Sequence, residues 1–345
     1  MFVRQLMHVS SKAPCRVDLA GATLDIWPLY LFHESPVTVN FAVNRYTSCD
    51  IVTHASPQIV LRSTDLGVTD TFESLAHLQK AKRYRLPILA RLVRYFAPHL
   101  TSGFTMESTS EAPAGAGISG SSALMIATAT ALNRLTGCGY RLEKIREIAQ
   151  NVEAQVIRVP TGAQDYYPAM YGGISSIALT PAGIVRNALP VEANELNQRF
   201  VLVYTGAPRN SGINNWEVMK GHIDGNRAIH RNFDRIASIA NLMRDALESH
   251  DWDSAGRLMR EEWSYRRKNI RGITTPLIDV LVTTARRAGG TGAKVCGAGG
   301  GGCVVFLVEP DGKAKVAKAL ADAGGHVLDA QVAPLGVQLR VKGAR

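Results

Sequence analysis

The sequence predicts an α+β protein built from two domains. Its 345 residues exceed the size of one typical domain, for which about 150 residues is a soft guide. Strand and helix patterns alternate irregularly, which favours α+β over a doubly wound parallel sheet. A content of 46% hydrophobic and 20% charged residues excludes a disordered chain, a collagen and a coiled coil. We place the domain boundary after residue 190, which gives domains of 1–190 and 191–345.

In the first half of the chain, period-two alternation and turn residues indicate the strands. Ser56 and Pro57 predict a β-hairpin between strands at 48–53 and 58–63. The other strands are expected at 15–20, 37–43, 102–108 and 171–179. Helices are expected at 86–96, which is amphipathic, at 121–135, which is rich in alanine, and at 142–157.

In the second half, apolar runs predict strands at 200–204, 303–308 and 337–341. Helices are expected at 222–249, 277–288 and 313–323. Arg227, Arg231 and Arg235 recur every four residues, which predicts one solvated basic face on the first of these helices.

Several classes of protein and site are disfavoured. No apolar stretch approaches the about 18–20 residues of a membrane span, and the N-terminus lacks a signal-peptide core. The five cysteines are scattered without CxxC spacing, so we expect a reducing cytoplasm rather than disulfides or a zinc site. The nine histidines show no HExxH or other metal-binding spacing.

Charge and glycine content point to anionic ligands. The formal net charge is +10, which suits nucleic acid, an acidic membrane surface or small phosphorylated molecules. The 31 glycines are clustered, and these clusters distinguish between the three kinds of ligand better than the net charge does.

The first glycine cluster is PAGAGISGSSAL at 113–124. Its formal GxGxxG match lacks the second strand of a dinucleotide-binding unit, and its GxxxxG spacing lacks the P-loop lysine. The loop nevertheless leads into a helix, whose N-terminal N–H groups and partial positive charge form a phosphate site. A tight strand-to-helix turn without a ligand is the simpler alternative.

The second cluster, KVCGAGGGGC at 294–303, leads into a strand instead of a helix. Glycine costs conformational entropy, and a plain turn needs only one or two. Four consecutive glycines therefore suggest a backbone that passes close to a ligand or to the first loop.

Together these motifs resemble the GHMP small-molecule kinases, named for galactokinase, homoserine kinase, mevalonate kinase and phosphomevalonate kinase. Three motifs occur in the family's order: APCRVDLAGATLD at 13–25, PAGAGISGSSA at 113–123 and the glycine run at 294–303. The segments at 159–173 and 199–211 resemble the part that carries the catalytic aspartate and a strand and turn of the heptose-phosphate kinases. The resemblance implies an N-terminal domain related to the second domain of ribosomal protein S5 and a C-terminal α+β domain.

The resemblance implies a role for four residues in phosphoryl transfer. Asp165 would be the general base, and Arg16 would stabilise its charge and the developing alkoxide. Glu153 and Ser121 would hold Mg²⁺. An Asx-turn for Asp165 and solvated positions for Arg16 and Glu153 are the structural alternatives.

The resemblance also implies the ligand-binding residues. ATP would contact the first loop through Pro113, Gly115, Gly117, Ser119, Gly120, Ser121 and Ser122. The substrate would contact Gly21, Asp25, Trp27, Gln164, Tyr166, Arg209, Gly299 and Gly300.

The finer pattern is most like the D-glycero-D-manno-heptose 7-phosphate kinases. RVDLAGATLDIWPLY is similar to their RxxLAGGGTDxxPY segment, although Ala22, Trp27 and Tyr166 depart from that branch. Ser119 and Gly120 also exchange the family's Gly-Ser order. We expect ATP and a sugar or sugar phosphate as ligands, no nucleic acid or membrane, and a possible homodimer.

Three other functions remain open at this point. A kinase for another alcohol would act on galactose, a uronic acid, homoserine or mevalonate. A nucleic-acid-binding protein would concentrate its cations and aromatic residues on one surface. A catalytically silent regulator would bind a sugar without turnover, but Asp165, Glu153 and Arg16 argue against it.

Overall fold

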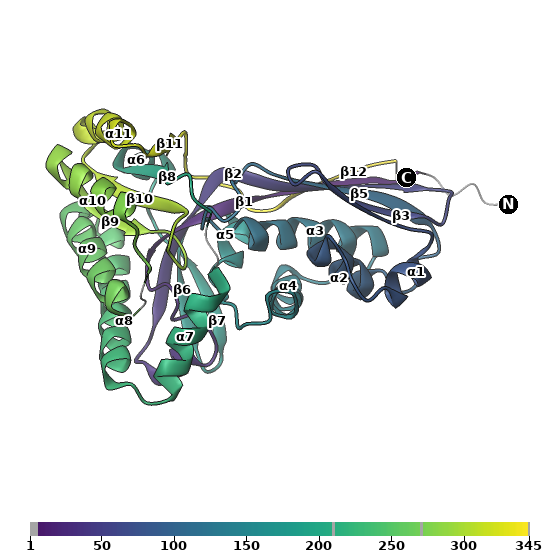
Figure 1. The fold of residues 1–345 in the computed structure, drawn as a ribbon, viewed down its shortest axis with the longest axis horizontal. Helices are drawn as coiled ribbons and strands as arrows, with labels where there is room; N and C mark the ends of the chain where they lie inside the picture. Colours follow the sequence, from purple (N-terminus) through teal and green to yellow (C-terminus); the bar gives the residue numbers. More distant parts are fainter. Residues whose placement is uncertain (1–5, 209–210, 270–271, 344–345) are drawn as a thin grey trace.

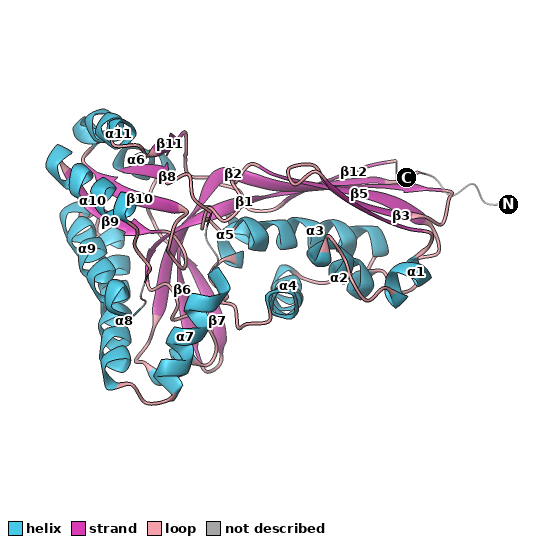
Figure 2. Cartoon of the chain, in the orientation of Figure 1, coloured by secondary structure: helices cyan, strands magenta, loops and turns pink. Residues whose placement is uncertain are grey.

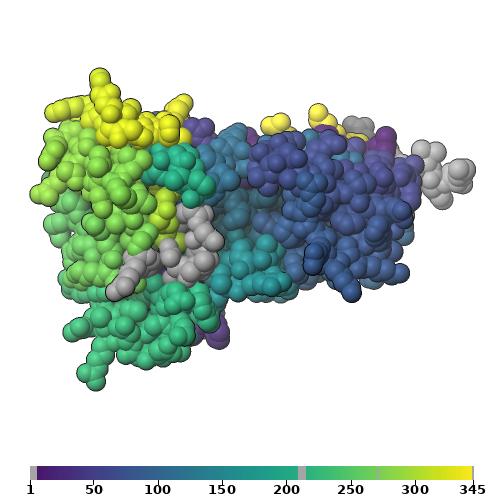
Figure 3. All heavy atoms as spheres, viewed as in Figure 1, coloured from purple at the N-terminus to yellow at the C-terminus, as the bar shows by residue number. Residues whose placement is uncertain are grey.

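The computed structural model describes residues 6–208, 211–269 and 272–343 (Figure 1). An eight-stranded sheet and a four-stranded sheet form its framework. The molecule is elongated: green to yellow residues of the second half of the chain gather at its broad end, and blue residues of the first half extend along its narrower end (Figure 3). The predicted α+β fold class is confirmed.

The large sheet has the strand order β12-β1-β2-β5-β3-β4, and β6 and β7 extend it beside β2. The 18-residue strand β2 pairs with β5 through Thr47–His54 and with β6 through Val37–Phe41. The strands of this sheet are β1 His8–Ala20, β2 Val37–His54, β3 Ile59–Ser63, β4 Val68–Phe72, β5 Gly103–Ser110, β6 Ile174–Thr180, β7 Gly183–Ala188 and β12 Gln338–Lys342.

Helices cover one face of the long part of this sheet (Figure 2). The central one, α3, packs on β1 and β2, and its alanine-rich sequence permits this close approach on several faces. Gly137 ends α3 in a left-handed conformation, as the glycines after the predicted helix suggested. The helices of this half are α1 Leu75–Lys80, α2 Pro87–Phe96, α3 Gly120–Thr136, α4 Leu142–Ile157 and α5 Tyr166–Tyr171.

The small sheet has the order β11-β8-β10-β9. Its strands are β8 Phe200–Tyr204, β9 Gly290–Val295, β10 Cys303–Val308 and β11 His326–Leu328. The helices of this half are α6 Ala193–Arg199, α7 Ser211–Ile223, α8 Arg227–Glu248, α9 Trp252–Asn269, α10 Pro276–Ala288 and α11 Lys313–Asp322. Short 3₁₀ turns span Leu29–Phe32 and Pro310–Gly312.

One predicted element is wrong, and another begins later than predicted. The hairpin at 48–63 does not form, because β5 lies between β2 and β3 and pairs with both. Gly103 makes this insertion possible, since its missing side chain admits the carbonyls of Ser56 and Gln58. The long helix predicted at 222–249 is confirmed as α8, Arg227–Glu248, but it begins five residues later, because a turn in which Gly225 has a φ of +81° separates it from α7.

The sequence also missed elements that the structure contains. The largest is α9, whose 18 residues carry an irregular mixture of charged and apolar side chains. Arg227, Arg231 and Arg235 do lie on one helix, α8, and Arg235 forms an ion pair with Glu261 of α9.

The last strand of the chain, β12, lies beside the first strand, β1. β12 pairs antiparallel with β1, which places the start of β1 and the end of β12 side by side at the narrow end of the molecule (Figure 1). The main hydrophobic core also runs from the large sheet into β8, β10, α8 and α9. The domain boundary after residue 190 therefore stays a prediction. Within the described ranges, no helix combines the length and apolar character required to cross a bilayer.

Candidate active site

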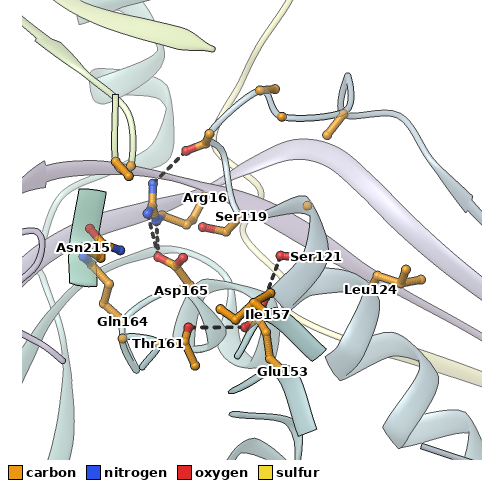
Figure 4. A pocket seen from close by; sticks show the side chains of 18 of the residues that line it. Arg16, Ser119, Ser121, Leu124, Glu153, Ile157, Thr161, Gln164, Asp165 and Asn215 are labelled. Atoms are coloured by element: carbon orange, nitrogen blue, oxygen red, sulfur yellow. Dashed lines mark hydrogen bonds and ion pairs between the residues drawn. The ribbon is translucent and has the colours of Figure 1, made fainter. Parts of the chain in front are cut away.

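A cavity of about 460 Å³ lies where the first glycine loop meets both halves of the chain. The end of β1, the loop at 112–121, the end of α4 and the segment at 157–165 line it. Gly297 and Ala298 of the second glycine cluster and Asn215 of α7 complete the wall. Figure 4 shows how the polar side chains converge on this space.

The first glycine loop is held against both the N-terminal strand and the second glycine cluster. Gly115 and Gly117 have φ angles of +68° and +79°, and Ser119 adopts the left-handed region at the start of α3. Cys303 donates its backbone N–H to the Ala116 carbonyl at 2.7 Å. A Cβ on Gly302 would lie 2.7 Å from that same carbonyl oxygen, so the two glycine clusters touch each other.

Arg16 and Asp165 form an ion pair at the cavity. Two guanidinium nitrogens, Nε and Nη2, reach Oδ1 of Asp165 at 2.8 and 2.6 Å (Figure 4). Burial disfavours the charged guanidinium, but the carboxylates of Asp165 and Asp18 outweigh this and raise the pKa of Arg16. Arg16 also donates to the Gly117 carbonyl at 3.2 Å, which links the ion pair to the glycine loop.

The described neighbours that hydrogen-bond to Glu153 are hydroxyl groups, not cations. Ser121 donates to Oε1 at 2.8 Å, while Ser122 and Thr161 approach Oε2 at 3.4 and 3.5 Å. Tyr166 also donates to Oε2. Burial raises the pKa of Glu153, and the hydroxyls of Tyr166 and Ser121 oppose that shift.

Asp25 lies deep in the same cavity. Its carboxylate accepts the Gln164 backbone N–H at 2.8 Å and the Gln164 side-chain amide at 3.3 Å. Gly162 is required here, because any Cβ would collide with that carboxylate. Burial, together with the nearby charge of Asp165, raises the pKa of Asp25 to about 6.

Three side-chain polar atoms of the cavity lining have no hydrogen-bond partner among the described residues. They are the hydroxyl of Ser119, the amide oxygen of Gln164 and the amide oxygen of Asn215. Because an unsatisfied buried polar group costs free energy, these three atoms are candidate hydrogen-bond partners for a ligand in the cavity. Sequence reasoning missed Asn215, since no motif contains it and only the placement of α7 brings it to the cavity.

Sequence reasoning also missed the apolar part of the lining. Leu66, Ile88, Leu124 and Ile157 contribute to the cavity from four separate segments. Their individual apolar character carries no signal, because most apolar residues serve the core. Only the tertiary structure distinguishes them.

Several residues predicted to contact ligand do not line the cavity. Tyr166 is fully buried and points to Glu153, because α5 starts directly after Asp165 and turns the ring inward. Ser122 also turns to Glu153. Trp27 is 66% exposed outside the cavity.

The predicted glycine contacts differ as well. Gly21 packs against Val37 and Thr38, and its φ of +82° serves the turn after β1. Gly299 and Gly300 pack against 272–273, and Gly297 and Ala298 reach the cavity instead. Arg209 lies outside the described residues.

Family comparison agrees with this architecture. Residues 86–173 match the GHMP kinases N terminal domain, and residues 243–326 match the GHMP kinases C terminal domain. The chain belongs to the GHMP kinase family. It is thus an enzyme of the small-molecule kinase class, as the motifs predicted.

Relatives within this family differ in their named substrates. The chain is 25% identical over 339 residues to a D-glycero-alpha-D-manno-heptose 7-phosphate kinase of Campylobacter jejuni, covering 96% of this chain and 98% of that one. It is 27% identical to a galactokinase of Roseiflexus, covering 88% and 84% of the two chains. A mevalonate kinase of Thermococcus onnurineus is 28% identical over 72% of each chain.

Solved structures share the whole fold. A D-glycero-D-manno-heptose 1-phosphate kinase of Bacteroides thetaiotaomicron superposes with a TM-score of 0.76 at 23% identity, over 96% of this chain and 98% of that one. The galactokinase of Lactococcus lactis, solved with galactose, superposes with a TM-score of 0.76 at 16% identity, over 96% of this chain and 95% of that one.

Proposed function

We propose that this GHMP kinase transfers the γ-phosphate of ATP to a sugar hydroxyl, with the anomeric hydroxyl of a heptose 7-phosphate as the preferred acceptor. The observation that carries the proposal is the Arg16–Asp165 ion pair, which faces the cavity beside the helix-initiating glycine loop. The full-length similarity to the Campylobacter heptose 7-phosphate kinase supports this acceptor.

Phosphoryl transfer mainly requires positioning and charge neutralisation. Both donors of Arg16 converge on Oδ1 of Asp165, so Oδ2 remains, among the described contacts, to accept the proton of the sugar hydroxyl. The Arg16 guanidinium then stabilises the negative charge that develops on the acceptor oxygen. Backbone N–H groups at the start of α3 would bind the phosphates of ATP.

The residues around Glu153 fit a magnesium ion. Mg²⁺ prefers oxygen ligands and usually keeps waters and nucleotide phosphates alongside one or two carboxylates. Glu153 and the Ser121 hydroxyl offer such oxygens beside the glycine loop. Among the described residues, no cluster of three or more His, Cys, Asp or Glu side chains forms a complete metal cage. When bound, Mg²⁺ would neutralise charge on the phosphates.

Polar lining supports a sugar over mevalonate as the acceptor. Asp25, Gln164 and Asn215 present acceptor oxygens to the cavity, and Thr23 adds a hydroxyl. A sugar carries several adjacent hydroxyls that can donate to these atoms, whereas mevalonate carries fewer and an additional methyl group. Asp25 and Gln164 already hold each other, which fixes their orientation before the substrate binds.

The test is an assay of ADP release with heptose 7-phosphate, unphosphorylated heptose, galactose, glucuronate, homoserine and mevalonate. We expect the highest kcat/KM with heptose 7-phosphate. Asp165→Asn should lower kcat by about 10²–10⁴-fold, the usual contribution of a general base. Asp322→Asn, the same substitution at an exposed site, serves as the matched control.

Two results would overturn the proposal. One is the absence of ATP turnover with every sugar in the panel. The other is full activity of the Asp165→Asn variant. A preference for galactose or glucuronate would keep the sugar kinase and replace the heptose.

A further inference from the structure

The Arg16–Asp165 pair is the outer end of a larger buried ionic cluster. Behind Arg16 lies Asp18, two residues along the same strand, which is fully buried. Arg16 Nη1 donates to Asp18 Oδ1 at 2.8 Å. Asp18 and Lys294 belong to the first and third sequence motifs, yet neither lines the cavity.

Asp18 joins the two halves of the chain. Its Oδ2 accepts from Lys294 Nζ of β9 at 2.6 Å, and its Oδ1 also accepts the Gly297 N–H at 3.1 Å. Gly297 is one of the residues through which the second glycine cluster reaches the cavity. Asp18 therefore contacts both Arg16 and the backbone of that cluster.

The charges in this cluster balance. Three cations meet three carboxylates: Arg16, Arg266 and Lys294 with Asp18, Asp165 and Glu262. Burial alone favours the protonated acid, but Lys294, Arg16 and Arg266 outweigh it and hold the pKa of Asp18 well below its usual range. Asp18 is therefore an anion, and its loss would leave buried cations without compensation.

Asp18 limits the orientation that the Arg16 guanidinium can adopt toward its other partners. A guanidinium carries its donors in a rigid planar fork, so fixing one nitrogen fixes the direction of the others. Asp18 and the Gly117 carbonyl both hold Nη1, which leaves Nε and Nη2 directed at Asp165. Without the Asp18 charge, this orientation depends on one carbonyl contact and on Asp165 itself.

We propose that Asp18 is a positioning residue for phosphoryl transfer, which acts by holding the Arg16 guanidinium against Asp165. This inference rests on the proposed kinase function. On its other side Asp18 accepts from Lys294, which is itself paired with Glu262, and among the described contacts neither residue lines the cavity or pairs with Arg16. Variants of this rear pair therefore separate an effect on folding from an effect through Arg16.

The kinetic test is a double-mutant cycle of Asp18→Asn and Arg16→Lys. Asparagine preserves shape and an acceptor oxygen but removes the charge. We expect Asp18→Asn to lower kcat at least 30-fold, with the KM for ATP within threefold of wild type. In the Arg16→Lys background, Asp18→Asn should lower kcat less than threefold, because the guanidinium fork that Asp18 orients is absent.

Two kinetic results would overturn the inference. One is a folded Asp18→Asn variant whose kcat stays within threefold of wild type. The other is an equal loss of kcat in both backgrounds, which indicates an effect independent of Arg16. If Asp18→Asn does not fold, Asp18→Asn/Lys294→Met replaces it in the cycle, because its amide no longer faces an ammonium group.

A control and a spectroscopic measurement complete the test. Lys294→Met/Glu262→Gln removes the rear pair and should retain kcat within threefold. The ¹⁵N resonance of Arg16 Nε–H, assigned by its loss in Arg16→Lys, should be protected from exchange in wild type and in this control. It should lose protection in the variant lacking the Asp18 charge, and unchanged protection would overturn the inference.

This measurement needs no turnover. A wild-type protein that phosphorylates no sugar defeats the proposed function, whereas the Arg16 signal still reports whether Asp18 orients the guanidinium.

Discussion

The two sides of the cavity hold their carboxylates by different means. On one side Asp165 is paired with the Arg16 guanidinium, which is itself anchored by Asp18. On the other side, hydroxyls of Ser121, Ser122, Thr161 and Tyr166 surround Glu153. Both carboxylates lie beside the same loop, but among the described contacts Asp165 pairs with a cation and Glu153 does not.

This difference matches two chemical demands. A guanidinium pair is charge-assisted and directional, so it fixes a carboxylate in one orientation. Neutral hydroxyls hold a carboxylate with weaker individual bonds and leave its charge uncompensated. The first arrangement suits a group that must meet a hydroxyl at a defined angle. The second suits a group that receives a cation, and three predictions test this division.

The largest expected effect is on the charged side. Arg16→Gln should lower kcat by about 10²–10³-fold, the usual cost of removing one stabilising donor from a transition state. Steady-state kinetics with the sugar found in the substrate panel measure this loss. Arg91→Gln is the control, since Arg91 is half-buried between α2 and α4, donates to Gln155, and does not line the cavity. A decrease below tenfold would contradict the assigned role.

The next effect concerns Asp25, which accepts two amide hydrogen bonds and forms no ion pair with any described residue. Its pKa is about 6 in the folded protein, against an ordinary value of 3.8. The folded state therefore binds this proton more tightly, and the stability that Asp25 contributes falls as the pH rises from about 4 to about 6. The free energy of unfolding of Asp25→Asn, relative to that of wild type, should therefore rise by on the order of 2–3 kcal/mol between these pH values.

Urea unfolding at pH 4.5 and pH 7 measures this difference. Asp322→Asn, at an exposed helix end, should show no such gain. A stability difference between wild type and Asp25→Asn that does not change with pH would contradict the prediction.

The smallest effect is on the hydroxyl side. Glu153→Gln should raise the Mg²⁺ concentration for half-maximal activity about tenfold, because the amide retains hydrogen bonds but lacks the charge that attracts the cation. A Mg²⁺ titration at fixed ATP measures this requirement. Tyr166→Phe keeps the carboxylate of Glu153 and removes one hydrogen-bond donor to it. Its Mg²⁺ concentration for half-maximal activity should stay within threefold of the wild-type value. An unchanged requirement in Glu153→Gln would place the cation elsewhere.

Local signals predicted many elements well. The expected helix at 142–157 and the strands at 200–204 and 303–308 coincide with α4, β8 and β10. Long-range pairing was less accessible. The hairpin at 48–63 failed because β5, about 40 residues further on, pairs with both of its strands. A local turn signal contains nothing about a strand inserted from elsewhere.

The candidate site shows the same contrast between what local sequence indicates and what the fold decides. Family resemblance selected Arg16 and Asp165, and the fold brings these residues into contact across 149 positions of sequence. It also selected Glu153 and Ser121, which form a hydrogen bond. Their roles in catalysis and metal binding stay predictions.

By itself, the sequence determined the fold class, the family and the chemistry-bearing motifs, because glycine loops, apolar periodicity and charged residues carry their physical constraints locally. Only the tertiary structure decided which side chains face the cavity. It turned Tyr166 inward, brought Asn215 to the wall and placed Asp18 between Arg16 and Lys294. Direction and partner depend on packing between distant segments, which single-residue patterns do not encode.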